Sequence, residues 1–107
     1  MSTKSKTISV AQIQKKFGDL SFGRLLKSHR LGEELSQVEM AKHLNISKQS
    51  LNDLEQGRKI PSIRRAIDIS KKIGILNELA IQLVLQDQIK KENLRYTVSV
   101  RKNSVGN

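Results

Sequence analysis

Apolar residues recur at helical spacing through most of the chain, and short polar segments divide them into separate helices. Between positions 21 and 74 this pattern predicts four helices, each preceded by a serine, a residue type that caps helix N-termini well. The predicted caps are Ser21, Ser36, Ser47 and Ser62, and the predicted stops are Gly32, Asn45, Gly57 and Gly74. A fifth amphipathic helix is predicted over residues 77–92. We therefore expect an all-α fold with five helices.

The two ends of the chain carry different patterns. Apolar residues between positions 8 and 17 predict a short helix from about Val10 to Lys16. Near the other end, apolar and polar residues alternate from Leu94 to Arg101, which is the spacing of a short β-strand. One strand alone is unstable in water, so this one needs a second edge to pair with. The expected organisation is an arm (1–20), a helical domain (21–74), a C-terminal helix and strand (75–101) that contact a second copy or another protein, and a disordered tail (102–107).

Composition limits the core and the kinds of chemistry that the chain can perform. With 107 residues, 36% of them hydrophobic and only 3% aromatic, we expect one domain with a thin aliphatic core that gains from a second subunit. The sequence contains no cysteine, which excludes disulfides and thiolate metal sites. It also lacks a long apolar run and an apolar leader, so we expect a cytoplasmic protein with no membrane partner.

The chain is strongly basic. Twenty Lys and Arg face ten Asp and Glu, giving a net charge of +10. The excess is not confined to a tail, because residues 21–74 contain eleven basic and six acidic residues. A polyanion is the usual partner that relieves such self-repulsion. The alternative is a basic surface that only keeps the protein in solution, and composition does not separate the two.

Two short predicted helices between positions 37 and 54 are joined by a tight turn. Ser36 and Glu39 have the spacing of a capping box, in which each side chain satisfies a free backbone donor. Asn45 can adopt the positive φ that the turn requires, and Ala41 is small enough for the second helix to cross it closely. The residues expected to fill the space between these helices are Met40, Leu44, Ile46, Leu51 and Leu54.

The second of these helices has a polar face opposite its apolar one. The residues expected to project outward together are Lys48, Gln49, Asn52 and Asp53. They supply the donors and acceptors that base edges in the DNA major groove require. Taken alone, such a polar face is more often only solvated. The interpretation as a DNA contact therefore depends on the motif that flanks the helix.

The segment from Phe22 to Gly74, about half of the chain, resembles the helix-turn-helix of the lambda repressor and Cro class, also called the XRE family. The likeness rests on Ser36-Gln37 at the start of the motif, on Glu55-x-Gly57 at its end and on Pro61 before the next helix. Asn45 stands where the family more commonly has glycine. The resemblance implies a lambda-repressor-like DNA-binding domain.

The same resemblance implies roles for individual side chains. Lys48, Gln49 and Asp53 match positions that contact bases, with Asn52 as their neighbour. The residues expected at backbone phosphates are Gln37, Ser47, Arg58, Lys59 and Arg64. Arg30 and Glu55 match a structural ion pair between the first helix and the end of the recognition helix.

Two functions follow as hypotheses. One is a sequence-specific transcriptional repressor that binds double-stranded DNA as a homodimer. The alternative is an antitoxin of the HigA type, which represses its own operon and also binds a small toxin. An enzyme finds no support in the sequence, and neither a cofactor, a metal nor a small-molecule substrate is expected, because His29 and His43 have no third ligand or nucleophile near them. A purely structural module would leave the polar helix face and the basic loop unexplained.

Overall fold

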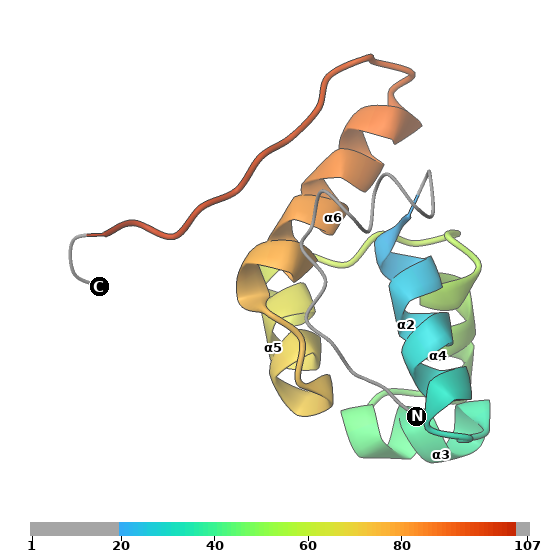
Figure 1. Ribbon diagram of the computed structural model, residues 1–107. Helices are drawn as coiled ribbons and strands as arrows, with labels where there is room; N and C mark the ends of the chain where they lie inside the picture. The colour runs from blue at the N-terminus through green and yellow to red at the C-terminus, as the bar shows by residue number, and fades with distance from the viewer. Residues whose placement is uncertain (1–19, 105–107) are drawn as a thin grey trace.

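Serine side chains set the start of the first four helices that the structure describes. The structure is a computed structural model, and it describes residues 20–104. Its helices are α2 (Phe22–Gly32), α3 (Gln37–Leu44), α4 (Lys48–Glu55), α5 (Ile63–Ile73) and α6 (Asn77–Lys91) (Figure 1). Each of α2 to α5 begins after a serine whose hydroxyl oxygen accepts a backbone N–H of the first turn; these serines are Ser21, Ser36, Ser47 and Ser62. The expected all-α fold and its helix starts are confirmed, whereas the helix predicted over 10–16 lies outside the described residues.

The helix ends agree with the sequence at three places and in part at a fourth. Asn45 adopts the left-handed conformation (φ 59°), and Gly57 and Gly74 have positive φ values of 77° and 76°. At the fourth place, α2 ends at Gly32 as predicted, but Gly32 is its last helical residue and the positive φ falls on Glu34 (59°). Here the Leu35 N–H donates to the Arg30 carbonyl oxygen at 3.0 Å, the bond that closes a Schellman motif. This turn brings Leu35 back against the core.

The core is aliphatic apart from Phe22 and is built where the five helices meet. α2 packs against α4 and α6, α3 packs against α4 and α5, and α5 lies along α6 (Figure 1). Gly23 allows the close contact between α2 and α4, because a Cβ at this position would overlap the carbonyl oxygen of Leu54. The buried hydrophobic residues are Phe22, Leu26, Met40, Ala41, Leu44, Leu51, Leu54, Ala66, Ile69, Leu79, Ala80, Leu83 and Val84.

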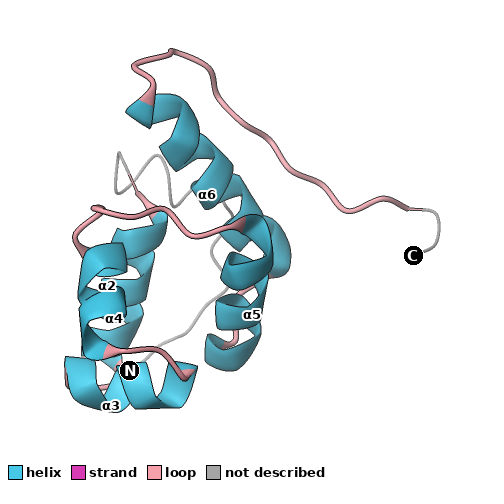
Figure 2. Cartoon of the chain, turned by 180° about the vertical axis from the view of Figure 1, so that it is seen from behind, coloured by secondary structure: helices cyan, strands magenta, loops and turns pink. Residues whose placement is uncertain are grey.

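The C-terminal segment is extended, but it pairs with no strand among residues 20–104 (Figure 2). Side chains of α6 take the place of a neighbouring strand. Gln86 donates from Nε2 to the Tyr96 carbonyl oxygen at 2.7 Å and accepts the Val98 N–H at Oε1 at 2.8 Å. The Val100 N–H donates to Oε1 of Gln82 at 3.2 Å. The β-strand predicted over 94–101 is therefore wrong for the single chain. The segment is extended, but the partners of its backbone groups are glutamine side chains and not a second strand.

The spacing of these contacts follows from helix and strand geometry. Four residues advance a helix by about 6 Å, and two residues advance an extended chain by about 6.6–6.8 Å. Gln82 and Gln86 are four apart, and the N–H groups that they bind, on Val98 and Val100, are two apart. The two repeats nearly match, so consecutive turns of α6 can each hold an alternate residue of the segment.

None of the helices described between residues 20 and 104 has the length and apolar character needed to cross a membrane.

Candidate nucleic-acid interface

The turn between α3 and α4 is held by backbone and side-chain hydrogen bonds. The N–H of Asn45 donates to the Lys42 carbonyl at 3.1 Å, and the N–H of Ile46 donates to the Ala41 carbonyl at 2.9 Å. From α5, the Lys72 ammonium donates to the Leu44 carbonyl at 3.2 Å. These bonds satisfy carbonyls at the end of α3 that the helix leaves free. As a result, the direction in which α4 leaves the turn is fixed.

The four residues predicted to contact bases lie together on the outer side of α4. Lys48 and Gln49 are exposed, while Asn52 and Asp53 are half-buried. On the opposite side, Leu51 and Leu54 are buried in the core. The structure therefore brings the predicted residues onto one face, and this face is short, polar and rigidly mounted.

Asp53 is the centre of a hydrogen-bond network on this face that the sequence did not reveal. Its Oδ1 accepts Nε2 of Gln49 at 3.0 Å and Nε of Arg58 at 2.9 Å. Its backbone carbonyl accepts the N–H groups of Arg58 and Lys59 at 2.9 and 3.3 Å. The hydrogen bond from Arg58 lowers the pKa of the Asp53 carboxyl, so this group is ionised at neutral pH. The network joins the basic loop after α4 to the helix itself.

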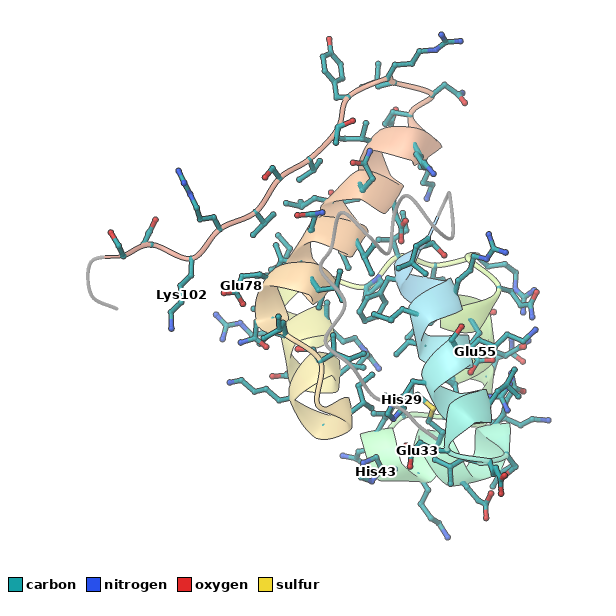
Figure 3. All side chains as sticks on the ribbon, in the orientation of Figure 1. His29, Glu33, His43, Glu55, Glu78 and Lys102 are labelled. Carbon is teal, nitrogen blue, oxygen red and sulfur yellow. The ribbon has the colours of Figure 1, made fainter. Side chains whose placement is uncertain are left out.

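The ion pair predicted between Arg30 and Glu55 is present and buried. Nε and Nη2 of Arg30 donate to the two carboxylate oxygens of Glu55 at 2.7 and 3.1 Å, and Nη1 donates to the Leu35 carbonyl at 3.0 Å. The Glu55 side chain is 0% exposed and that of Arg30 is 11% exposed. The hydrogen bond to Glu55 raises the pKa of Arg30. Glu55 lies where α2 passes α4 (Figure 3), and Arg30 lies in the last turn of α2, so the pair joins the end of α2 to the end of α4.

Two residues expected at phosphates use their side chains within the protein. Nε2 of Gln37 donates to Oδ1 of Asn52 at 3.2 Å and to Oε1 of Glu55 at 3.1 Å, which engages both amide hydrogens. The hydroxyl of Ser47 caps α4 and donates to the hydroxyl of Ser50 at 2.9 Å. For both residues, the backbone N–H groups at the helix N-termini are the donors that remain available to a phosphate.

The basic residues expected at phosphates are exposed. Arg58 and Lys59 lie on the loop after α4, and Arg64 lies in the first turn of α5. Arg64 borders a surface hollow of about 370 Å³ that Arg65 and Lys72 also line, between the α3–α4 turn and α5. Cationic side chains thus occur beyond the end of α4 and beside the turn that precedes it.

Among the described residues, the two histidines form no metal site with their neighbours. His29 and His43 lie close to Glu33 (Figure 3), and Nε2 of His43 lies 3.3 Å from the Lys72 carbonyl oxygen. Among residues 20–104 no group of three or more His, Cys, Asp or Glu side chains could hold a metal ion.

Two short capped helices joined by a left-handed residue, with the second presenting a polar face, define the class of helix-turn-helix DNA-binding proteins. Residues 26–76 match the family described as Helix-turn-helix. The chain is also 41% identical over 66 residues to the ImmF control region 10 kDa protein of Bacillus phage phi105. The matched region covers 58% of this chain and 73% of the phage protein. No solved structure matches the chain. The chain belongs to the XRE-type helix-turn-helix family and is a DNA-binding transcriptional regulator.

Proposed function

We propose that this protein is a sequence-specific repressor that binds its operator as a homodimer, with α4 in the major groove. The observation that carries this proposal is the outer face of α4, where exposed Lys48 and Gln49 lie beside half-buried Asn52 and Asp53. A helix fits the major groove of B-DNA, and each base pair presents a distinct set of donors and acceptors there. The proposal also agrees with the name of the phage relative, which refers to a control region.

Base contacts and phosphate contacts have separate roles. Lys48 donates to the O6 and N7 acceptors of guanine, and Gln49 pairs with adenine. Arg58, Lys59 and Arg64 bind phosphates and set the position of α4 on the duplex, as do the N-termini of α3 and α4 at Gln37 and Ser47.

Selection of binding sites from a pool of random DNA duplexes tests the proposal. The wild-type chain should enrich one sequence with two related half-sites. Gln49→Ala should lose the preference for one base pair in each half-site, with a fall of about 1–3 kcal/mol in binding to the selected duplex. Gln88→Ala is the matched control, because Gln88 is an exposed glutamine on α6. A wild-type chain that enriches no sequence, or a Gln49→Ala variant with unchanged preference, would contradict the proposal.

A homodimer is needed because one module of this size contacts only a few base pairs, whereas two modules bind half-sites about 34 Å apart. We place the dimer contact in the C-terminal region. Leu94 and Tyr96 are 51% and 68% exposed there. The backbone groups that point toward α6 are the carbonyl of Tyr96 and the N–H groups of Val98 and Val100. Along an extended chain, the N–H and carbonyl groups of successive residues point to opposite sides. The edge formed by residues 95, 97, 99 and 101 therefore faces away from α6 and fits an identical edge of a second copy.

The antitoxin hypothesis uses the same edge for a different partner. An extended segment with one unpaired edge can also add to the sheet of a small toxin. Self-pairing is our preferred assignment, because two identical edges can pair antiparallel about a two-fold axis, the same symmetry that two related half-sites have. The oligomeric state of the chain alone distinguishes the two partners.

A further inference from the structure

The Asp53 side chain belongs to the outer face of α4, but its carboxylate is turned toward neighbouring side chains. It is 14% exposed, and one oxygen, Oδ1, accepts both Gln49 and Arg58. The resemblance assigned Asp53 to base contacts. A carboxylate held in this way is poorly placed to reach a base of its own, so its effect falls on the two residues that it holds.

The bond to Asp53 fixes which end of the Gln49 amide faces which way. A glutamine amide has two N–H donors on nitrogen and one carbonyl acceptor. Because an ionised carboxylate only accepts hydrogen bonds, Nε2 of Gln49 must point toward Asp53 and Oε1 must point away from it. Gln49 therefore keeps one N–H and one carbonyl oxygen for a ligand.

This remaining pair distinguishes the two purines. Adenine presents the N7 acceptor and the N6 donor in the major groove, which match one N–H and one carbonyl. Guanine presents two acceptors, N7 and O6. Against guanine, Oε1 of a held Gln49 would face O6, and a second N–H donor would be missing because Asp53 has taken it.

We propose that Asp53 is a positioning residue that sets specificity, holding the Gln49 amide in the orientation that accepts adenine and rejects guanine. The inference rests on the proposed function. The same carboxylate occupies Nε of Arg58 and leaves the terminal nitrogens of that guanidinium free for phosphate. Arg58 in turn balances a negative charge that would otherwise repel DNA.

Two substitutions separate positioning from charge. Asp53→Ala and Asp53→Asn both remove the negative charge, but only Asp53→Asn keeps an Oδ1 acceptor for Gln49. The backbone carbonyl that holds the loop is present in both variants. Each full-length variant is used to select from the random duplex pool, and its binding to the wild-type site is compared with binding to the same site carrying guanine in place of the selected adenine.

The wild-type chain should prefer adenine by about 5- to 150-fold, the range for one bidentate base contact. Asp53→Ala should lose most of this preference at the position that Gln49→Ala also affects, while Asp53→Asn should keep it. Arg58→Ala is the control for a loosened loop, and it should bind more weakly to both duplexes with the adenine preference kept.

Several outcomes would overturn the inference. One is an adenine preference that Asp53→Ala leaves intact; another is a base other than adenine at the position that depends on Gln49. A third is a change confined to a different base pair, which would mean that Asp53 contacts its own base. Failure of the wild-type chain to select any sequence would instead overturn the proposed function. Thermal melting of each variant confirms that the compared proteins are folded.

Discussion

Arg30 and Glu55 form a two-pronged ion pair between α2 and the last residue of α4, with Nε 2.7 Å from Oε2 and Nη2 3.1 Å from Oε1. Removing one partner of a buried pair leaves an uncompensated charge, and Glu55→Ala should cost about 3–5 kcal/mol of unfolding free energy. Urea denaturation measures this loss. Glu33→Ala, at an exposed position, is the control and should change stability by less than about 0.5 kcal/mol. A loss below about 1 kcal/mol for Glu55→Ala would mean that the pair behaves like a surface ion pair.

Gly23 and Gly32, both on α2, should respond oppositely to alanine. A Cβ at position 23 would overlap the Leu54 carbonyl oxygen and lie 3.1 Å from that of Glu55, so Gly23→Ala should push α2 away from α4 and cost at least about 1–3 kcal/mol. Nothing lies within 4 Å of a Cβ at Gly32, where alanine should be neutral or stabilise by up to about 1 kcal/mol through helix propensity. Thermal and urea unfolding of the two variants test this contrast. Equal effects would mean that the α2–α4 contact is looser than described.

Phosphate contacts should be visible in the salt dependence of DNA binding. Lys59→Ala and Arg64→Ala should each weaken binding to selected and random duplexes alike, and each should reduce the salt slope by about 1. Titrations at several salt concentrations give the slope. Lys102→Ala, on the C-terminal segment, is the control expected to leave the slope unchanged. A slope unchanged in both of the first two variants would place the phosphate contacts elsewhere.

Asp87 should give the fold a measurable pH dependence. Its Oδ2 accepts the N–H of Phe22 at 3.0 Å, and burial raises the pKa of this half-buried carboxyl. A carboxyl whose pKa is higher in the folded state stabilises the fold below its ordinary pKa, and this contribution is lost as the pH rises through the raised value. Asp87→Asn keeps an acceptor but carries no charge, so its stability relative to the wild type should increase between acid and neutral pH. Urea midpoints at about pH 3.5 and pH 7 measure the change, and a difference that is the same at both would contradict the assignment.

The free edge of the C-terminal segment should be sensitive to proline. Ser99→Pro removes an N–H on the edge that faces away from α6, whereas the N–H groups held by Gln82 and Gln86 belong to Val98 and Val100. We expect Ser99→Pro to be a monomer with weak operator binding and Ser99→Ala to remain a dimer, as measured by light scattering. A Ser99→Pro dimer with normal binding would exclude this edge as the self-association surface. A wild-type monomer would favour a toxin or another protein as its partner.

Helix starts could be predicted because they are decided locally. Each capping serine needs only the backbone of its own first turn, and Asn45 needs only its own tolerance of positive φ. The turn after α2 could not be predicted in the same way: the helix ends at Gly32, but Glu34 takes the positive φ, because the path of the turn depends on where Leu35 packs.

The missed parts of the site depend on residues that meet only after folding. In the sequence, Gln82 is a polar interruption of an apolar run. Its buried amide can be explained only after folding, when its oxygen accepts the N–H of Val100. Asp53 has the spacing of a base-contacting residue, and only the path of the loop brings Arg58 back to it. The sequence around Gly23 does not indicate why a glycine is required there, because the requirement comes from the close backbone of α4.

The glutamine contacts from α6 also bear on the entropy of association. Ordering the backbone of a free chain costs about 1–2 kcal/mol for each residue. Because Gln82 and Gln86 already hold the segment from Tyr96 to Val100 in the single chain, part of this cost is met during folding. A partner then encounters an edge that has few conformations left to lose, so a short segment can contribute to a stable contact that a flexible tail of the same length could not form.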